Sequence, residues 1–399
     1  MSADCLTLRV DRPAGTPESA KFPVMVWIYG GGDTFGQIYD SAYDPTGLVL
    51  DHIATFGGDP DNVTIFGESD GATGVGLQIT AYRGKQKAPF KRDIMQSGGP
   101  IADRETAGDK SLSYTKQLTS LVQCLRSIPM AKINSIAVAY EKKVGGNAGM
   151  GAFIPVAPSR FIPDSPSKLL ATGRFSRNID TLSGWNEDDG SFSTLPTLSS
   201  EEDVSAYLKY EYPALSNKTI KAAMALYPVS SFQDFPSENI SAHYFRISQL
   251  KRDAEFTCAS LYTVQMNHNQ IILCEAYSAA NVSYLGVSHF SDIPYVFNQA
   301  SAEAWAPYAA KEDLRLSSEM SGSWTAFAKT GRPSAGNGTV DGWVGAFDSA
   351  GAGQDEYLRV ISGPDSGSRK ISNGKYGYDG LAARCAFWTS QEELDGMGV

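Results

Sequence analysis

The sequence lacks several features that mark particular classes of protein. Its 34 Lys and Arg are outnumbered by 44 Asp and Glu, giving a formal net charge of −10. It therefore has no excess of positive charge for nucleic acid or an anionic membrane surface. No apolar run approaches the roughly 20 residues that cross a bilayer. None of the five cysteines lies in a CxxC pair, and no Cys/His cluster has zinc spacing. We predict a protein without a metal site, a nucleic-acid partner or an integral membrane segment.

We also expect no signal peptide after Met1, because the sequence opens directly on a strand-like run at residues 5–10. Asn-x-Ser/Thr sequons are nevertheless compatible with a secretory route. One of them is weaker than the others, since its Thr64 belongs to a predicted strand. The sequons lie at Asn62, Asn217, Asn239, Asn281 and Asn337.

Apolar runs and helical patterns alternate in the first third of the chain, which is typical of a mostly parallel sheet. The continuous apolar run at residues 23–29 predicts a strand buried on both faces. The remainder is more helical and shows no internal repeat or linker, so we expect one domain over residues 1–399. The other predicted strands are 63–66, 93–96 and 270–276, the predicted helices are 72–81, 116–126 and 238–267, and 334–354 is a predicted loop.

A glycine-serine motif, Gly67-Glu68-Ser69-Asp70-Gly71, stands between a predicted strand and a predicted helix. A nucleophilic serine on a tight strand-to-helix turn needs small residues two positions before and after it, and the glycines supply them. The start of the helix also aims backbone N–H groups at the reacting atoms. The alternative is an incidental serine in a glycine turn. The flanking strand and helix favour Ser69 as the nucleophile of an α/β-hydrolase fold.

Three glycines, Gly30-Gly31-Gly32, follow the strand predicted at 23–29. Acyl transfer builds negative charge on a carbonyl oxygen, and glycines let backbone N–H donors approach that oxygen closely. The spacing does not match the G-x-G-x-x-G of dinucleotide-binding folds. A glycine turn without a function is the remaining alternative.

Four histidines are available as the base that a serine nucleophile needs. The chain order serine, acid, histidine of α/β-hydrolases excludes His52. His243 lies in a helical stretch and His268 in a polar turn, which modestly favours His289. The acid is expected in the run Glu187-Asp188-Asp189, after a strand end. Spacing does not choose among these three carboxylates, and a solvated acidic loop is the alternative.

The order and combination of these motifs resemble the type-B carboxylesterase/lipase family, which includes the cholinesterases and many fungal esterases. The matching stretches extend over nearly the whole chain. They are Ala3-Asp4-Cys5-Leu6, residues 24–32, 56–60 and 67–69, Gln96-Ser97-Gly98, Gly184-x-Asn186-x-x-Asp189-Gly190, Gly286-Val287-Ser288-His289, Pro294-Tyr295-Val296-Phe297 and Cys385-Ala386-Phe387-Trp388.

The resemblance implies an α/β-hydrolase fold and the hydrolysis of a small carboxylic ester through an acyl-enzyme, with no cofactor. It assigns the acid to Asp189, which directly precedes the motif's glycine, and the base to His289. The oxyanion would be met by the backbone N–H groups of Gly31, Gly32 and Asp70. Glu68, next to the nucleophile, would support the site without reacting. Because members of this family are secreted, the resemblance further implies a secreted protein.

The resemblance also implies a disulfide between Cys258 and Cys385, whose sequence contexts match the last disulfide of the family. Cys5 and Cys124 match cysteines of two other family disulfides, but their partners are absent from this chain. Cys274 has no counterpart in the family.

The chain departs from the family pattern in two kinds of place. It lacks the region that precedes Cys5 in the family, and near Leu50–Asp51 it lacks an internal segment. That segment includes an interior strand expected between the strands at 5–10 and 24–29. In addition, acidic residues stand beside the reacting groups, because Asp70 replaces the common alanine and Asp33 follows the glycines. A carboxylate that pointed inward would oppose the oxyanion. The alternatives to an esterase are therefore a non-catalytic family member with a binding role and an inactive truncated product.

Overall fold

The computed structural model describes most of the 399-residue chain. The described residues are 7–15, 17, 19–45, 58–102, 128–144, 154–212, 215–267, 271–276, 283–302, 309–334, 336–346, 357–361, 366–371 and 380–397. The helix predicted at 116–126 lies outside them, as do His52, His268, Cys5 and Cys124.

In the described part of the chain, strands form one sheet in which the spatial order equals the chain order. Neighbouring strands are parallel from β1 to β6, and β7 is antiparallel to β6. The mostly parallel sheet of an α/β-hydrolase is therefore confirmed. The strands are β1 (Val24–Ile28), β2 (Val63–Glu68), β3 (Arg92–Gln96), β4 (Asp180–Asn186), β5 (Ile271–Ala276), β6 (Tyr357–Val360) and β7 (Gly367–Lys370).

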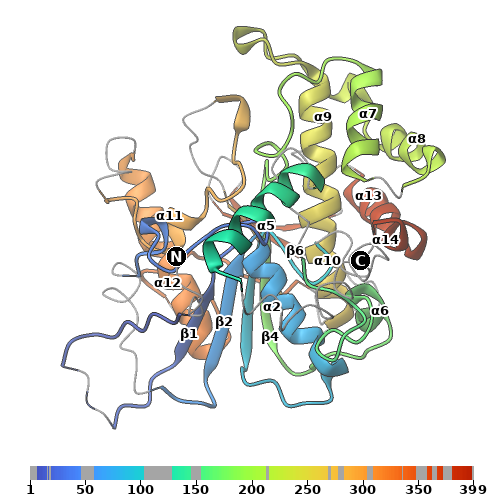
Figure 1. Ribbon diagram of the computed structural model, residues 1–399. Helices are drawn as coiled ribbons and strands as arrows, with labels where there is room; N and C mark the ends of the chain where they lie inside the picture. The colour runs from blue at the N-terminus through green and yellow to red at the C-terminus, as the bar shows by residue number, and fades with distance from the viewer. Residues whose placement is uncertain are drawn as a thin grey trace, which may run out of the picture.

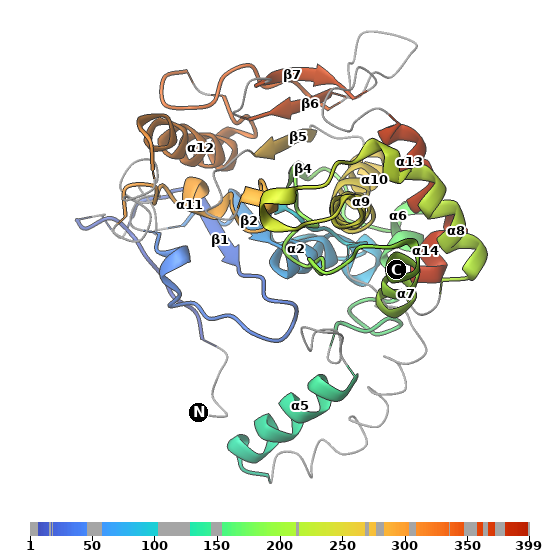
Figure 2. The ribbon, with the colours of Figure 1, turned by 90° about the horizontal axis from the view of Figure 1, so that it is seen from above.

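Helices cover both faces of this sheet. Figure 2 shows α11 and α12 on one side of it, and α2, α9 and α10 on the other. The α-helices are α2 (Asp70–Thr80), α5 (Met130–Val144), α6 (Pro166–Ala171), α7 (Glu201–Glu211), α8 (Asn217–Leu226), α9 (Ala242–Lys251), α10 (Cys258–Asn267), α11 (Ile293–Val296), α12 (Lys311–Thr330), α13 (Leu381–Trp388) and α14 (Gln391–Met397). Short helices are η1 (Ser41–Tyr43), η2 (Ala81–Gly84), η3 (Val229–Ser231), η4 (Pro236–Glu238), the π-helical turn η5 (Arg252–Thr257) and η6 (Ser283–Leu285). None of the described helices is both long and apolar enough to cross a membrane.

The central strands divide the core into two layers, because successive side chains of a strand point to opposite faces. Ile65 of β2 and Met95 of β3 pack into the same apolar cluster as Val75 and Ile79 of α2. The adjacent residues on the two strands point to the other face and pack with α11 and α12, in a second cluster that includes Phe66, Ile94, Trp324 and Phe327. Ile65 and Phe66 of β2 are apolar and point to opposite faces, which explains why this strand could be predicted from sequence.

Two predictions about the first part of the chain are wrong. Strand β1 is half-buried along its whole length, not buried on both faces, because it pairs with β2 on one side and has no partner strand on the other within the described residues. Residues 7–10, the described part of the strand predicted at 5–10, form no strand. An extended segment becomes a strand by hydrogen bonding to a neighbour. Both differences are consistent with the missing interior strand, which would have separated these two segments.

The helix predicted at 238–267 is divided into α9, η5 and α10, which follow one another along one column (Figure 1). It begins at Ala242, where Ser241 accepts a hydrogen bond from the His243 N–H.

Candidate active site

Ser69 lies at a sharp turn between β2 and α2. Its backbone has φ 60° and ψ −128°, a conformation that costs a non-glycine residue about 1–3 kcal/mol and is typical of functional sites. The two glycines of the motif are required by close packing: a Cβ on Gly67 would lie 2.5 Å from Gly71 O, and one on Gly71 would lie 1.9 Å from Ile28 O. The turn is fixed to the next strand by a 2.9 Å hydrogen bond from Ser69 N to Gln96 O.

The glycine loop after β1 lies directly against this turn. A Cβ on Gly30 would lie 2.7 Å from Glu68 O and 2.8 Å from Ser69 Cβ. Gly31 and Gly32 follow with φ 122° and 62°, which favour glycine. The sequence therefore brings the predicted oxyanion donors and the predicted nucleophile together through backbone contact that larger residues would prevent.

Two carboxylates accompany this loop, as the departures from the family pattern suggested. The Asp33 N–H donates a hydrogen bond to the Asp70 carboxylate, so the Asp70 side chain points from the start of α2 towards the glycine loop. Desolvation and then the charge of Asp70 raise the pKa of Asp33 to about 7. The region in which an oxyanion would form therefore contains negative charge.

Asp189, on the loop after β4, contacts His289. Its Oδ1 lies 2.9 Å from His289 Nδ1, and its Oδ2 accepts a 2.7 Å hydrogen bond from Asn186 N. Asp189 is 1% exposed, so the carboxylate that contacts the imidazole is also shielded from water. Because a carboxylate only accepts, this contact places a proton on Nδ1 and leaves Nε2 as the ring nitrogen that the predicted base would use.

The neighbouring carboxylate of Asp188 faces another partner. Asp188 Oδ2 accepts a 2.8 Å hydrogen bond from Val287 N, and Asp188 N donates to Val287 O at 3.0 Å. These two bonds attach the acid loop to the loop that carries His289. Burial raises the pKa of Asp188. The solvated acidic loop that was an alternative in the sequence is therefore wrong for Asp188 and Asp189.

A buried polar network lies behind the site and was not recognised in the sequence. Gln96 Nε2 donates to Asp292 Oδ2 at 2.5 Å, and Trp324 Nε1 donates to Gln96 Oε1 at 2.9 Å. Asn186 Nδ2 donates to Ser288 O at 3.0 Å and to Asp292 Oδ1 at 3.2 Å. The network joins the ends of β3 and β4 to the His289 loop. The polar residues Gln96 and Asn186 at the ends of these strands could have indicated such a network. Their partners lie far away in the sequence and could not be predicted from it.

The reactive nitrogen of His289 faces Glu68. The distance from His289 Nε2 to Glu68 Oε1 is 3.2 Å, within ion-pair range but without hydrogen-bond alignment. Burial raises the pKa of Glu68, although His289 opposes this. Burial lowers the pKa of His289, but the charge of Glu68 and the hydrogen bond to Asp189 outweigh it and raise the pKa overall.

Ser69 and His289, both among the described residues, share no hydrogen bond in this arrangement. The geometry thus brings together the predicted acid and base, and Nε2 of the base faces Glu68 instead of Ser69.

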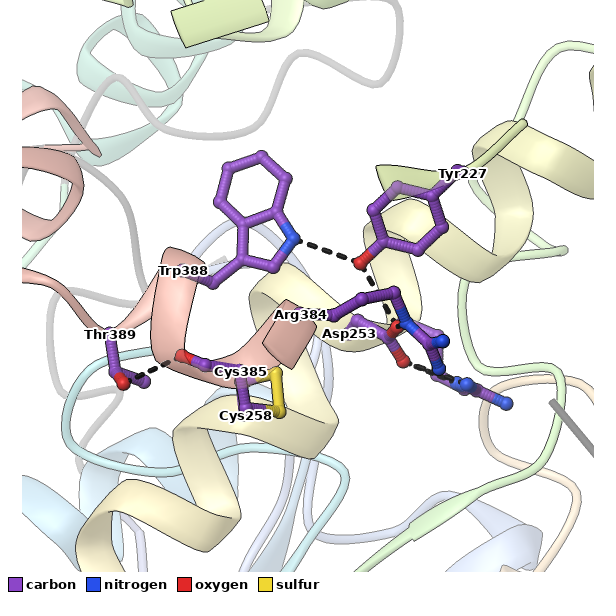
Figure 3. Close-up of a disulfide and its surroundings, with 8 residues drawn as sticks. Tyr227, Asp253, Cys258, Arg384, Cys385, Trp388 and Thr389 are labelled. Atoms are coloured by element: carbon purple, nitrogen blue, oxygen red, sulfur yellow. Dashed lines mark hydrogen bonds and ion pairs between the residues drawn. A yellow bond between two sulfur atoms is a disulfide. The ribbon is translucent and has the colours of Figure 1, made fainter. Parts of the chain in front are cut away.

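The remaining predicted site residues are two cysteines. Cys258 at the start of α10 and Cys385 in α13 form a disulfide with a Cα–Cα distance of 5.0 Å, which is the pair that the resemblance implies. Figure 3 shows this disulfide beside a cluster of buried polar side chains.

Comparisons with known proteins agree with the geometry. A sequence model of the Carboxylesterase family matches residues 1–50 and 47–377, so the match is divided at the joint near Leu50. An inactive carboxylesterase-like protein, VdtD of Byssochlamys spectabilis, is 30% identical over 97% of this chain and 80% of its own length. That alignment spans 478 residues, more than the 399 of this chain, so the relative contains segments that are missing here.

Two further relatives are lipases. A secreted lipase of Arthroderma benhamiae is 28% identical over 99% of this chain and 82% of its own length. The bile salt-activated lipase of Bos taurus is 26% identical over 92% of this chain and 73% of its own length. Since the family model covers most of the sequence, this chain belongs to the carboxylesterase family.

Proposed function

We propose that this protein is a secreted serine hydrolase that cleaves small carboxylic esters through an acyl-enzyme, with Ser69, His289 and Asp189 as its catalytic residues. The observation that carries the proposal is the 2.9 Å contact between His289 Nδ1 and the buried Asp189. Asp189 follows the carboxyl end of β4, and Ser69 follows the carboxyl end of the parallel strand β2 in a strained turn. The family's ester chemistry supports the same reaction.

The proposed reaction begins when Ser69 Oγ attacks the ester carbonyl and transfers its proton to His289 Nε2. The carbonyl oxygen becomes an oxyanion, which accepts hydrogen bonds from the backbone N–H groups of Gly31, Gly32 and Asp70. His289 then gives its proton to the departing alkoxide, leaving the acyl group on Ser69. Water attacks this ester, loses a proton to His289, and releases the carboxylic acid as His289 returns the proton to Oγ.

The resting arrangement must change before the first step. His289 Nε2 faces Glu68 and has to turn towards Ser69 Oγ, and it must be neutral to accept a proton. A neutral Glu68 weakens its hold on the imidazole. Burial favours this neutral form, because it raises the pKa of Glu68. In this proposal the ionised Glu68 holds a protonated imidazole and raises its pKa, and protonation of Glu68 releases the ring.

The test is hydrolysis of p-nitrophenyl acetate and butyrate by the wild type, Ser69→Ala and Asp189→Asn. We expect Ser69→Ala to lose about 10⁶-fold in kcat and Asp189→Asn about 10⁴-fold. Ser97→Ala is a matched control, since Ser97 is a buried serine with φ 48° at the end of the neighbouring strand, and it should keep wild-type activity. Equal activity in the wild type and Ser69→Ala would contradict the proposal.

A second candidate function is ligand binding without turnover. Two observations favour it: His289 Nε2 faces Glu68, and the Asp70 carboxylate lies against the glycine loop. A relative with 30% identity is named inactive. In this case the wild type would fold cooperatively and give no hydrolysis above background. The wild type and Ser69→Ala would bind carboxylic esters with equal affinity.

A further inference from the structure

The π-helical turn η5 contacts the loop of the proposed acid. Arg252 Nη1 donates a 3.1 Å hydrogen bond to Glu187 O, two residues before Asp189. The loop is also pressed against the start of the turn, because a Cβ on Gly190 would lie 2.0 Å from Ser248 O and 2.9 Å from Arg252 N. A π-helical turn inside a longer helix is rare and frequently occurs at functional sites.

The same turn contacts the proposed base. The centroids of the Phe256 and His289 rings are 4.9 Å apart, and their planes make an angle of 31°. His289 holds one hydrogen bond at Nδ1 and is 16% exposed at its side chain. A ring laid along one face of the imidazole restricts its rotation and limits the access of water from that side.

The opposite side of the turn is fixed to the C-terminal helix α13. The buried carboxylate of Asp253 accepts hydrogen bonds from Arg384 Nε at 2.6 Å and Tyr227 OH at 3.0 Å, and Trp388 Nε1 donates to Tyr227 OH at 2.9 Å (Figure 3). The disulfide of Cys258, the residue directly after the turn, provides a second attachment to α13. Arg252 donates to the other oxygen, Asp253 Oδ1, at 3.0 and 2.7 Å, so both oxygens of this buried carboxylate are paired and Asp253 holds the turn against α13.

Resting on the proposed hydrolysis, we infer that Arg252 and Phe256 are positioning residues for the Asp189–His289 pair. Arg252 fixes the acid loop and Phe256 orients the imidazole. Asp253 and the disulfide hold the turn in the register that both contacts need. Helix α13 therefore contacts the turn that positions Asp189 and His289, although α13 contributes no atom to the reaction.

A purely structural role for the turn is the competing explanation, and Tyr212→Phe provides the matched control. Tyr212 OH donates a 2.6 Å hydrogen bond to Glu255 Oε1 of the same turn. Its removal should lower the stability of the turn without touching either catalytic loop. Phe256 is only partly buried, so Phe256→Leu is compatible with folding, and Phe256→Tyr keeps the ring.

The experiment compares these variants by ester hydrolysis and by the downfield proton resonance of the His289 Nδ1–H···Asp189 hydrogen bond, assigned through its loss in His289→Gln. Phe256→Leu should lower kcat about tenfold with little change in KM and should broaden the resonance. Phe256→Tyr and Tyr212→Phe should retain both. The resonance can be measured even if the wild type hydrolyses no ester, so failure of the proposed function remains distinguishable. An unchanged kcat and resonance in Phe256→Leu, or equal changes in Tyr212→Phe, would overturn the inference.

Discussion

In the proposed mechanism, two acidic side chains beside Ser69, Glu68 and Asp70, determine at the residue scale whether the site reacts. Glu68 lies 3.2 Å from the nitrogen that must accept the proton, and Asp70 accepts a hydrogen bond from the backbone of the glycine loop. The first carboxylate affects the charge of the base. The second affects the oxyanion.

Glu68→Gln should move the pH dependence of hydrolysis. His289 acts as a base only when it is neutral, so activity rises as the pH passes upward through its pKa. The charge of Glu68 raises that pKa, and the glutamine removes the charge while keeping the shape of the side chain. We expect the acidic limb of the kcat/KM profile to move to lower pH by about one unit. A limb that stays in place would show that Glu68 does not control the base.

Asp70→Asn should increase kcat by about tenfold, equivalent to ~1.4 kcal/mol. The substitution removes a negative charge near the developing oxyanion and keeps an oxygen that can accept from the Asp33 N–H. Steady-state hydrolysis of p-nitrophenyl butyrate measures the change. Asp61→Asn is the control, because Asp61 is exposed at the opposite end of β2. A lower or unchanged kcat in Asp70→Asn would contradict an electrostatic role for Asp70.

At the scale of secondary-structure elements, the disulfide joins α10 to α13 across 127 positions of sequence. Replacing both cysteines, Cys258→Ser with Cys385→Ser, should lower the free energy of unfolding by about 3–5 kcal/mol, because the unfolded chain gains freedom. Urea unfolding measures this difference, and reduction of the wild type should reproduce it. A double variant as stable as the oxidised wild type would refute the expectation.

The elements that could be predicted are those whose signal is local. Strand β2 contains a short apolar run, and the glycines around Ser69 mark a turn whose close contacts exclude other residues. The half-burial of β1 depends on which strand pairs with it, and the roles of Arg252 and Phe256 depend on loops far away in the chain. A helical pattern also gives no sign of a π-helical turn. Long-range contacts, rather than weak local signals, account for what was missed.

At the scale of the whole molecule, the described residues form one sheet with helices on both faces, although the match to the family is divided near Leu50. In the described part, β1 has a partner on one side only, and such an edge can pair with another chain. The core nevertheless continues from β2 to β6 through the larger apolar cluster.

Calorimetry should therefore give a single unfolding transition, with the calorimetric enthalpy close to the van't Hoff enthalpy. We expect this because the apolar cluster that joins α2 to the sheet also includes residues of α10 and α13. Two separate transitions would contradict the prediction of one domain.

The central claim is that Ser69 is a nucleophile activated by His289 and Asp189, and covalent labelling tests it most directly. Diethyl p-nitrophenyl phosphate should release about one equivalent of p-nitrophenol per chain. Peptide mapping should then place the diethylphosphoryl group on Ser69. Ser69→Ala should remain unlabelled, and His289→Gln should react far more slowly. A folded wild type that releases no p-nitrophenol, or that carries the label on another residue, would contradict the account.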